Sequence, residues 1–410
     1  MEGPLAIAAL YIFKAAFGWW LSLLNLRSLQ KSSGPALDGR LSAGLLEKSQ
    51  AYLAENTRFA VLSSVVSTSL IIAFVFGLLV HYDRWVASFG LGFIASGIAF
   101  FLILSFAGEL ASIPFSLYRT FRIEKRHGFN AMTPGLWLTD LVKSLVLSTV
   151  LFSVVATGGL FVVKAFPGLW WLIGWAFFLV FSIFMMYISP YVIEPLFNKF
   201  EPVDDERFRK KIESLAERAG IRIKAIMKID ASRRTKHTNA YFTGFGSVKR
   251  IVLFDTLLKN LTPAEAASVL AHEIGHWKRR HLLKHLFLLE AGALAAFYIS
   301  FRLINGDLLA RLFGLGDPGF FAKLVCLSLL WAIAGFFVAP VLNAISRRHE
   351  READAYAARL EGAEAMTSAL VKLTEDNLSN PFPHPLYVFF NYSHPPVEER
   401  IRLLKGKRDV

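Results

Sequence analysis

The sequence contains about seven apolar stretches that are each long enough to cross a lipid bilayer, and this feature limits the possible folds more than any other. A membrane-spanning helix needs about 20 consecutive, mostly apolar residues. A cleaved signal peptide is a competing interpretation of the first stretch, but no basic segment precedes it and the stretch is long. We therefore predict a mostly α-helical integral membrane protein with a tight turn at Pro167 between the fourth and fifth spans. The predicted spans are 5–24, 59–80, 86–113, 145–166, 168–189, 282–303 and 320–345.

The composition agrees with a membrane protein and excludes several other classes. Hydrophobic residues make up 54% of the 410 residues and charged residues 19%, whereas soluble domains carry about 25% charged residues. The net charge of +13 would suggest nucleic-acid binding in a soluble protein, but basic loops of a membrane protein explain it and no nucleic-acid-binding motif is present. The single cysteine, Cys326, excludes an intrachain disulfide and a cysteine-based zinc cluster. A bound metal would therefore need His, Asp or Glu ligands.

Charge also predicts the orientation in the membrane. Basic residues are concentrated in segments 25–58 and 114–144, and the positive-inside rule places such segments on the cytoplasmic side. The N-terminus is then outside, and both large polar segments, 191–281 and 346–410, are cytoplasmic. Within 191–281 we expect a charged helix over 205–219, closed by Gly220, and two or three short strands that include 223–229 and 251–254.

The segment His272-Glu273-Ile274-Gly275-His276 has the H-E-x-x-H pattern of zinc peptidases. Two histidines four residues apart share a helix face and can bind one ion, and the glutamate beside them can take a proton from a zinc-bound water. Thr262, Pro263 and Glu265 form a helix start, which supports a helical motif, and the small Ala271 and Gly275 would let this helix pack closely against a neighbour. The alternative is a surface helix with two solvated histidines.

A third ligand is expected in the segment 346–355, where Glu350 and Asp354 are four residues apart and Glu352 is turned away from their face. Glu350 as ligand, with Asp354 hydrogen-bonded to a ligand histidine, is chemically sensible. A charged helix next to the membrane would also be rich in Arg and Glu. We expect four parts: spans one to five with their loops (1–190), a metallopeptidase insert (191–281), spans six and seven (282–345) and a C-terminal peptidase segment with the third ligand (346–410).

Several blocks make the chain resemble the type I CAAX prenyl endopeptidases, a family of integral-membrane zinc metallopeptidases. The blocks are 114–118 with 123–130, 195–200, 239–245, 250–257, 272–276, 346–357 and 393–400. The resemblance implies one Zn²⁺ held by His272, His276 and Glu350, with Glu273 as general base and acid. It also implies that Asp354 supports the site, that His394 and Arg400 face the substrate backbone and the developing oxyanion, and that Asn239 binds substrate on an edge strand.

The resemblance further implies a fold of seven helices around a large chamber, capped by a small α+β peptidase domain. Glu109, Lys164 and Glu290 are candidates for the chamber wall, with snorkelling near the span ends as the alternative. The expected partners are the lipid bilayer and a peptide or protein substrate, prenylated or not, and no nucleic acid. The short loop 305–319, with His349 and Arg351 where aromatic residues are expected, suggests a bacterial or compact member. A bacterial inner membrane is then favoured, or the endoplasmic reticulum if the chain is eukaryotic.

Other functions stay open at this point. The same chemistry could serve quality-control proteolysis of misfolded membrane proteins. A membrane chaperone or scaffold could bind peptides without cutting them, but every expected ligand is present here. A transporter with a structural metal would be favoured by discontinuous spans and inverted repeats, and the sequence shows neither.

Overall fold

The computed structural model describes residues 2–31, 39, 41, 43–243 and 248–406, and seven of its helices are long and apolar enough to cross a membrane. The third span begins later than predicted, because Val86 still belongs to the second span, which ends at Ala87, and a short connection separates it from Phe93. The tight turn at Pro167 is confirmed. The spans are formed by α1 (Glu2–Lys31), α2 with η1 and α3 (Ala43–Ala73, Phe74–Leu78, Leu79–Ala87), α4 with η2 (Phe93–Tyr118, Arg119–Glu124), α5 (Pro134–Ala165), α6 with η3 and α7 (Trp170–Ile188, Ser189–Ile193, Glu194–Phe197), α11 (His281–Ile304) and α13 (Phe320–Glu361).

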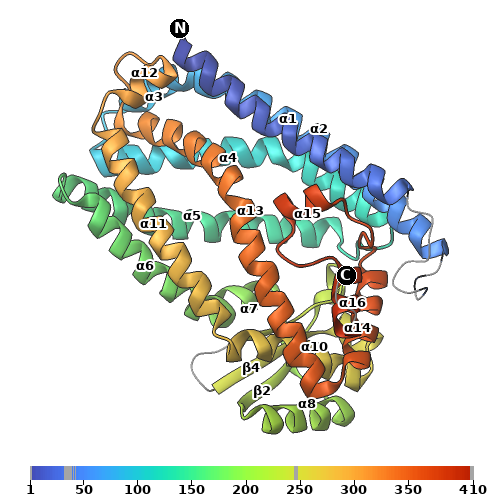
Figure 1. Cartoon of the computed structure of the whole chain (residues 1–410). Helices are drawn as coiled ribbons and strands as arrows, with labels where there is room; N and C mark the ends of the chain where they lie inside the picture. Colours follow the sequence, from blue (N-terminus) through green and yellow to red (C-terminus); the bar gives the residue numbers. More distant parts are fainter. Residues whose placement is uncertain (1, 32–38, 40, 42, 244–247, 407–410) are drawn as a thin grey trace.

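The seven spans form a closed ring (Figure 1). Contacts run from α1 to α2, from α3 to α4, and then through α5, α6, α11 and α13 back to α1. The accessible surface is 21449 Å², whereas a compact protein of this mass would expose about 16,000 Å². The excess agrees with a ring whose inner face is also accessible, as the predicted fold class requires. Near α12 (Leu308–Phe313), the ring is closed by a buried cluster that includes Phe100, Phe313 and Phe321.

The polar part of the chain contains a four-stranded sheet with the order β1-β2-β4-β3. The strands are β1 (Phe200–Pro202), β2 (Arg222–Ile229), β3 (Ala240–Thr243) and β4 (Val248–Phe254). β2 and β4 are parallel, whereas β1 and β3 pair antiparallel at the two edges. The sequence predicted two or three strands, whereas the sheet has four. The edge strands β1 and β3 are only three and four residues long, so they carry little periodicity in the sequence.

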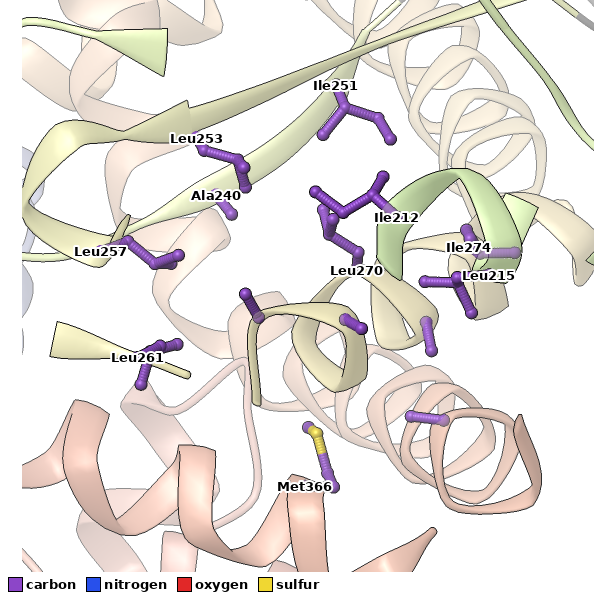
Figure 2. Packing of buried hydrophobic residues seen from close by; sticks show 14 of the residues in the cluster. Ile212, Leu215, Ala240, Ile251, Leu253, Leu257, Leu261, Leu270, Ile274 and Met366 are labelled. Carbon is purple, nitrogen blue, oxygen red and sulfur yellow. The ribbon is translucent and has the colours of Figure 1, made fainter. Parts of the chain in front are cut away.

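The two polar segments that precede and follow the last two spans in the sequence build one hydrophobic core together. Side chains from α8 (Glu206–Ala219), β4, α10 (Pro263–Lys278) and α14 (Ala363–Asp376) point toward one another (Figure 2). The charged helix predicted over 205–219 is confirmed: Asp205 accepts a hydrogen bond from the backbone of Arg207, and Gly220 ends the helix at φ +63°. The remaining short elements are η4 (Ala231–Arg233), α9 (Asp255–Asn260), α15 (Pro385–Asn391) and α16 (Val397–Leu404).

Candidate metal centre

The H-E-x-x-H segment lies on α10, whose start is fixed as the sequence predicts. The Thr262 hydroxyl accepts a hydrogen bond from the Glu265 N–H at 3.3 Å, and the Glu265 carboxylate accepts one from the Thr262 N–H at 2.7 Å. Pro263 occupies the first helical position. Glu265 also accepts hydrogen bonds from Ser368 and Lys372 on α14, so the capping residue anchors α10 to the neighbouring helix. This start places His272 and His276 on one helix face.

Close packing of α10 against α13 brings the third ligand candidate to the histidines. A Cβ atom on Gly275 would lie 3.0 Å from the Ala353 Cα and 3.2 Å from its carbonyl oxygen, so the two helix backbones almost touch there. Three residues before Ala353 on α13, Glu350 places its two carboxylate oxygens 3.2 Å from the Nε2 atoms of His272 and His276. One donor atom from each of these three residues lies within 4.8 Å of the other two.

The side-chain atoms of His272, His276 and Glu350 are arranged as metal ligands would be. The two Nε2 atoms of His272 and His276 face each other at 3.1 Å. Both Nδ1 atoms already contact other side chains, so both Nε2 lone pairs are directed into the same space. The Glu350 Oε2 atom is buried and makes no hydrogen bond with any residue that the structure describes. Two imidazole nitrogens and a carboxylate are the ligand types of catalytic zinc sites.

Asp354 and Arg400 support His272 on the Nδ1 side of its ring, away from the proposed metal position. The His272 Nδ1 lies 2.8 Å from the Asp354 carboxylate, and Arg400 donates to both oxygens of that carboxylate at 2.8 and 2.6 Å. Burial alone would lower the pKa of His272, but its hydrogen bond with Asp354 and the Glu350 carboxylate 3.2 Å away outweigh burial and raise the pKa to about 9. The Arg400 guanidinium is buried and 4.0 Å from Glu350, so the structure places it behind the ligands.

Glu273 and His394 lie where substrate could reach them. Glu273 is half-buried on α10, and burial raises the pKa of its carboxyl group. The His394 side chain is 62% exposed, and its Nε2 lies 3.3 Å from the Glu350 carboxylate. The backbone that carries His394 is held by the buried Arg347, which donates to the carbonyl oxygens of Val388 and Tyr392 at 3.1 and 2.6 Å.

Asn239 is exposed and directly precedes β3, the edge strand that packs against α10. Its side-chain oxygen accepts a hydrogen bond from the Ala240 N–H at 2.8 Å, and its carbonyl oxygen accepts one from the Phe254 N–H at 3.1 Å. The residue is thus paired with β4 on one side, and the other side faces outward from the sheet. The structure places Asn239 at an edge, as the sequence resemblance implies.

The three charged residues expected in the chamber wall have different surroundings. Glu290 is buried on α11, and neither carboxylate oxygen has a hydrogen-bond partner among the described residues. Glu109 is half-buried on α4. Lys164 is exposed in the last turn of α5, as the snorkelling alternative requires.

Sequence reasoning missed three residues beside the site: Arg347, His281 and Glu352. His281 contacts His276, and Glu352 contacts His281, although Glu352 is off the helix face of Glu350 and Asp354. The spacing of five residues from His276 to His281 was a weak signal, because it only has meaning if a tight turn follows α10. No signal identified Arg347, since an arginine at the end of a span is ordinary.

Seven membrane-spanning helices with an H-E-x-x-H helix and a glutamate from a second helix define an integral-membrane metallopeptidase. Residues 22–199 match the family described as CAAX prenyl protease N-terminal, five membrane helices, and residues 202–408 match peptidase family M48. The chain therefore belongs to the M48 family of membrane metallopeptidases.

Individual relatives match this chain in sequence or in structure over nearly its whole length. The chain is 35% identical to the CAAX prenyl protease 1 homolog of Arabidopsis thaliana, over 97% of this chain and 95% of the relative. It is 33% identical to CAAX prenyl protease 1 of Saccharomyces cerevisiae, over 93% and 91%. The crystal structure of Ste24p from S. mikatae has a TM-score of 0.92 at 31% identity and covers 98% of this chain and 99% of its own. The predicted family and fold class are confirmed.

Proposed function

We propose that the protein is a zinc endopeptidase that cleaves peptide bonds near the C-terminus of prenylated CAAX-type substrates. The observation that carries this proposal is the convergence of His272, His276 and Glu350 on one point beside Glu273, at the end of a membrane ring. The name CAAX prenyl protease 1 for relatives that match over more than nine tenths of this chain supports the substrate class.

In this proposal each residue at the site has a separate task. His272, His276 and Glu350 hold one zinc ion, which when bound supplies Lewis-acid polarisation of a peptide carbonyl and of a water. Glu273 takes a proton from the attacking water and delivers it to the leaving amine. Its raised pKa favours the step that returns the proton.

We assign substrate contacts to the residues at the exposed side of the site. His394 donates to the carbonyl oxygen of the scissile bond as negative charge develops there. Asn239 and the free edge of β3 pair with an extended peptide backbone. Arg400 acts mainly by holding Asp354, which in turn orients His272, and adds positive charge 4.0 Å from Glu350.

We assign the substrate chain to a cavity beside α2 and α4. It has a volume of about 820 Å³ and lies between α2, α4 and the segment before α15. Tyr392 lines this cavity and is two residues before His394 in the sequence, and we propose that the cavity connects with the metal centre. Arg119 is the one cationic side chain in its described wall, and the wall contains no carboxylate among the described residues.

We place the peptidase part on the cytoplasmic side, because segments 25–58 and 114–144 are basic. Segments 191–281 and 346–410 are then one catalytic unit, and 1–190 and 282–345 supply the ring. A bacterial inner membrane is the favoured location. The support for a shared catalytic unit is the hydrophobic core that both polar segments build.

The test is cleavage of a farnesylated CAAX peptide by the purified full chain in detergent, beside an unprenylated copy. Each peptide is assayed with and without a chelator, and again after zinc is restored. Chelator-sensitive cleavage of the prenylated peptide alone is the expected result. Equal cleavage of both peptides would contradict the prenyl requirement and favour general membrane proteolysis. No cleavage of either by protein with one zinc per chain would refute the peptidase proposal.

A further inference from the structure

A second carboxylate lies behind the metal centre and reaches it through another histidine. His281 is the first residue of α11 and is 1% exposed. Its Nδ1 lies 3.0 Å from the Nδ1 of His276, and its Nε2 lies 3.2 Å from a carboxylate oxygen of Glu352. His276, His281 and Glu352 therefore form one line of hydrogen-bonded side chains, which runs from the metal centre to a carboxylate on α13.

The local backbone is built to bring His281 back to His276. Arg280 ends the turn after α10 at φ +55°, a conformation that is uncommon for a residue with a side chain. The Arg280 N–H donates to the Trp277 carbonyl oxygen, and the Arg280 carbonyl oxygen accepts from Lys284, so the turn joins the two helices directly. A residue held in a sparsely populated conformation commonly marks a functional constraint.

The hydrogen-bond direction in this line is fixed by its last member. An ionised carboxylate only accepts hydrogen bonds, so Glu352 requires the proton of His281 on Nε2. His281 then accepts on Nδ1, which requires the proton of His276 on Nδ1. The lone pair of His276 is therefore on Nε2, the atom that faces Glu350 and His272 at the metal centre.

We infer that His281 and Glu352 are positioning residues that hold His276 in the tautomer and ring orientation needed to bind the metal. The inference rests on the proposed role of His276 as a ligand. Asp354 does the same for His272 by a direct contact, so each ligand histidine has its own carboxylate, one direct and one relayed through His281. Residues of this kind commonly raise metal affinity and activity by roughly 10- to 100-fold.

The neighbouring histidines supply a matched control. His281 stacks on His349 with ring centres 4.0 Å apart, and the His349 Nδ1 lies 3.0 Å from the Nε2 of His285. His285 is one turn further along α11 and takes no part in the line from His276 to Glu352. Replacement of His285 therefore disturbs the same cluster without breaking the line.

The experiment measures zinc affinity by competition with a chelator, on the full chain in detergent, together with the thermal unfolding of the metal-free protein. His281→Phe keeps a ring that can stack on His349 but removes both hydrogen bonds, and we expect roughly 10- to 100-fold weaker zinc binding. Glu352→Ala should weaken binding in the same direction. Glu352→Gln keeps an oxygen acceptor for His281 and should bind more tightly than Glu352→Ala. His285→Leu should bind zinc as the unaltered protein does.

Three outcomes would overturn the inference: unaltered zinc affinity in His281→Phe, equal losses in His281→Phe and His285→Leu, or equal losses in Glu352→Gln and Glu352→Ala. If His281→Phe does not fold, the half-buried Glu352 variants decide the question. The readout is independent of peptidase activity, so the inference can stand when the proposed substrate is wrong. A Cobalt(II) absorption spectrum that changes in His281→Phe but not in His285→Leu would show that the ligand geometry itself has changed.

Discussion

At the scale of single residues, the two glutamates of the centre have opposite surroundings. Glu350 is within 3.3 Å of three histidines, which suits an ionised ligand. Glu273 is on the same helix as the two ligand histidines, and burial raises the pKa of its carboxyl group. A group with a raised pKa accepts a proton and gives it back near neutral pH, as general acid–base catalysis requires.

Replacement of Glu273 by Gln should separate binding of zinc from turnover. The amide has the same shape but cannot take up a proton, so we expect kcat to fall by roughly 100- to 10,000-fold. The variant should retain one zinc per chain, measured by elemental analysis. A normal cleavage rate would show that another group takes the proton.

Replacement of Arg400 by Lys tests the support of His272. A lysine cannot make both hydrogen bonds that the planar guanidinium makes to Asp354. We expect weaker zinc binding and a destabilisation of roughly 1–3 kcal/mol, measured by chelator competition and thermal unfolding. The matched control is Arg402→Lys on the same helix α16, and an equal effect of both changes would contradict a specific role of Arg400.

At the scale of elements, the contact between α10 and α13 sets the geometry of the site, because it brings ligands from two helices together. Gly275→Ala should be costly, since the new methyl group would meet the backbone of Ala353, which cannot move aside like a flexible side chain. We expect a destabilisation of roughly 1–3 kcal/mol and weaker zinc binding. Gly292→Ala on α11 is the control, because among the described residues no heavy atom beyond its own stretch of helix lies within 4 Å of the added methyl group. Equal unfolding temperatures for the two variants would refute the close-packing argument.

Local sequence signals were sufficient for elements whose ends are chemically marked. The Thr262 and Glu265 pair, the Asp205 cap and Gly220 each fix a helix end in the structure as they do in the sequence. The sequence did not indicate that α13 continues without a break from Phe320 to Glu361, because its apolar stretch ends near Ile345 while its helix does not. Contacts such as His281 with Glu352 depend on how distant elements pack, so no local pattern could predict them.

At the scale of the whole molecule, the ring and the peptidase part are tied together by ionisable groups. His237, before β3, lies 3.6 Å from Glu124 at the end of the third span and 2.8 Å from Asn377. Arg234 makes two hydrogen bonds with Asp140 on α5, at 2.8 and 3.0 Å. These contacts fix the position of the peptidase part on the ring.

The stability of this junction should depend on pH. The nearby Glu124 carboxylate, 3.6 Å away, raises the pKa of His237 above its usual value of 6.5. The stabilisation is therefore fully present below about pH 6.5 and is lost as the pH rises through the raised pKa. Thermal unfolding of His237→Gln should show a deficit at acidic pH that shrinks in alkaline solution. A deficit that is constant with pH would contradict the charged pairing.

The continuous helix α13 links insertion of the last span into the membrane to formation of the metal site. It is 42 residues long, or about 63 Å, and it carries both the seventh span and Glu350. We therefore expect Glu350 to reach His272 and His276 only after the last span has taken its place in the ring. A newly made chain should therefore have no peptidase activity during synthesis and should become active only when its insertion is complete. Membrane assembly would then be the activation step.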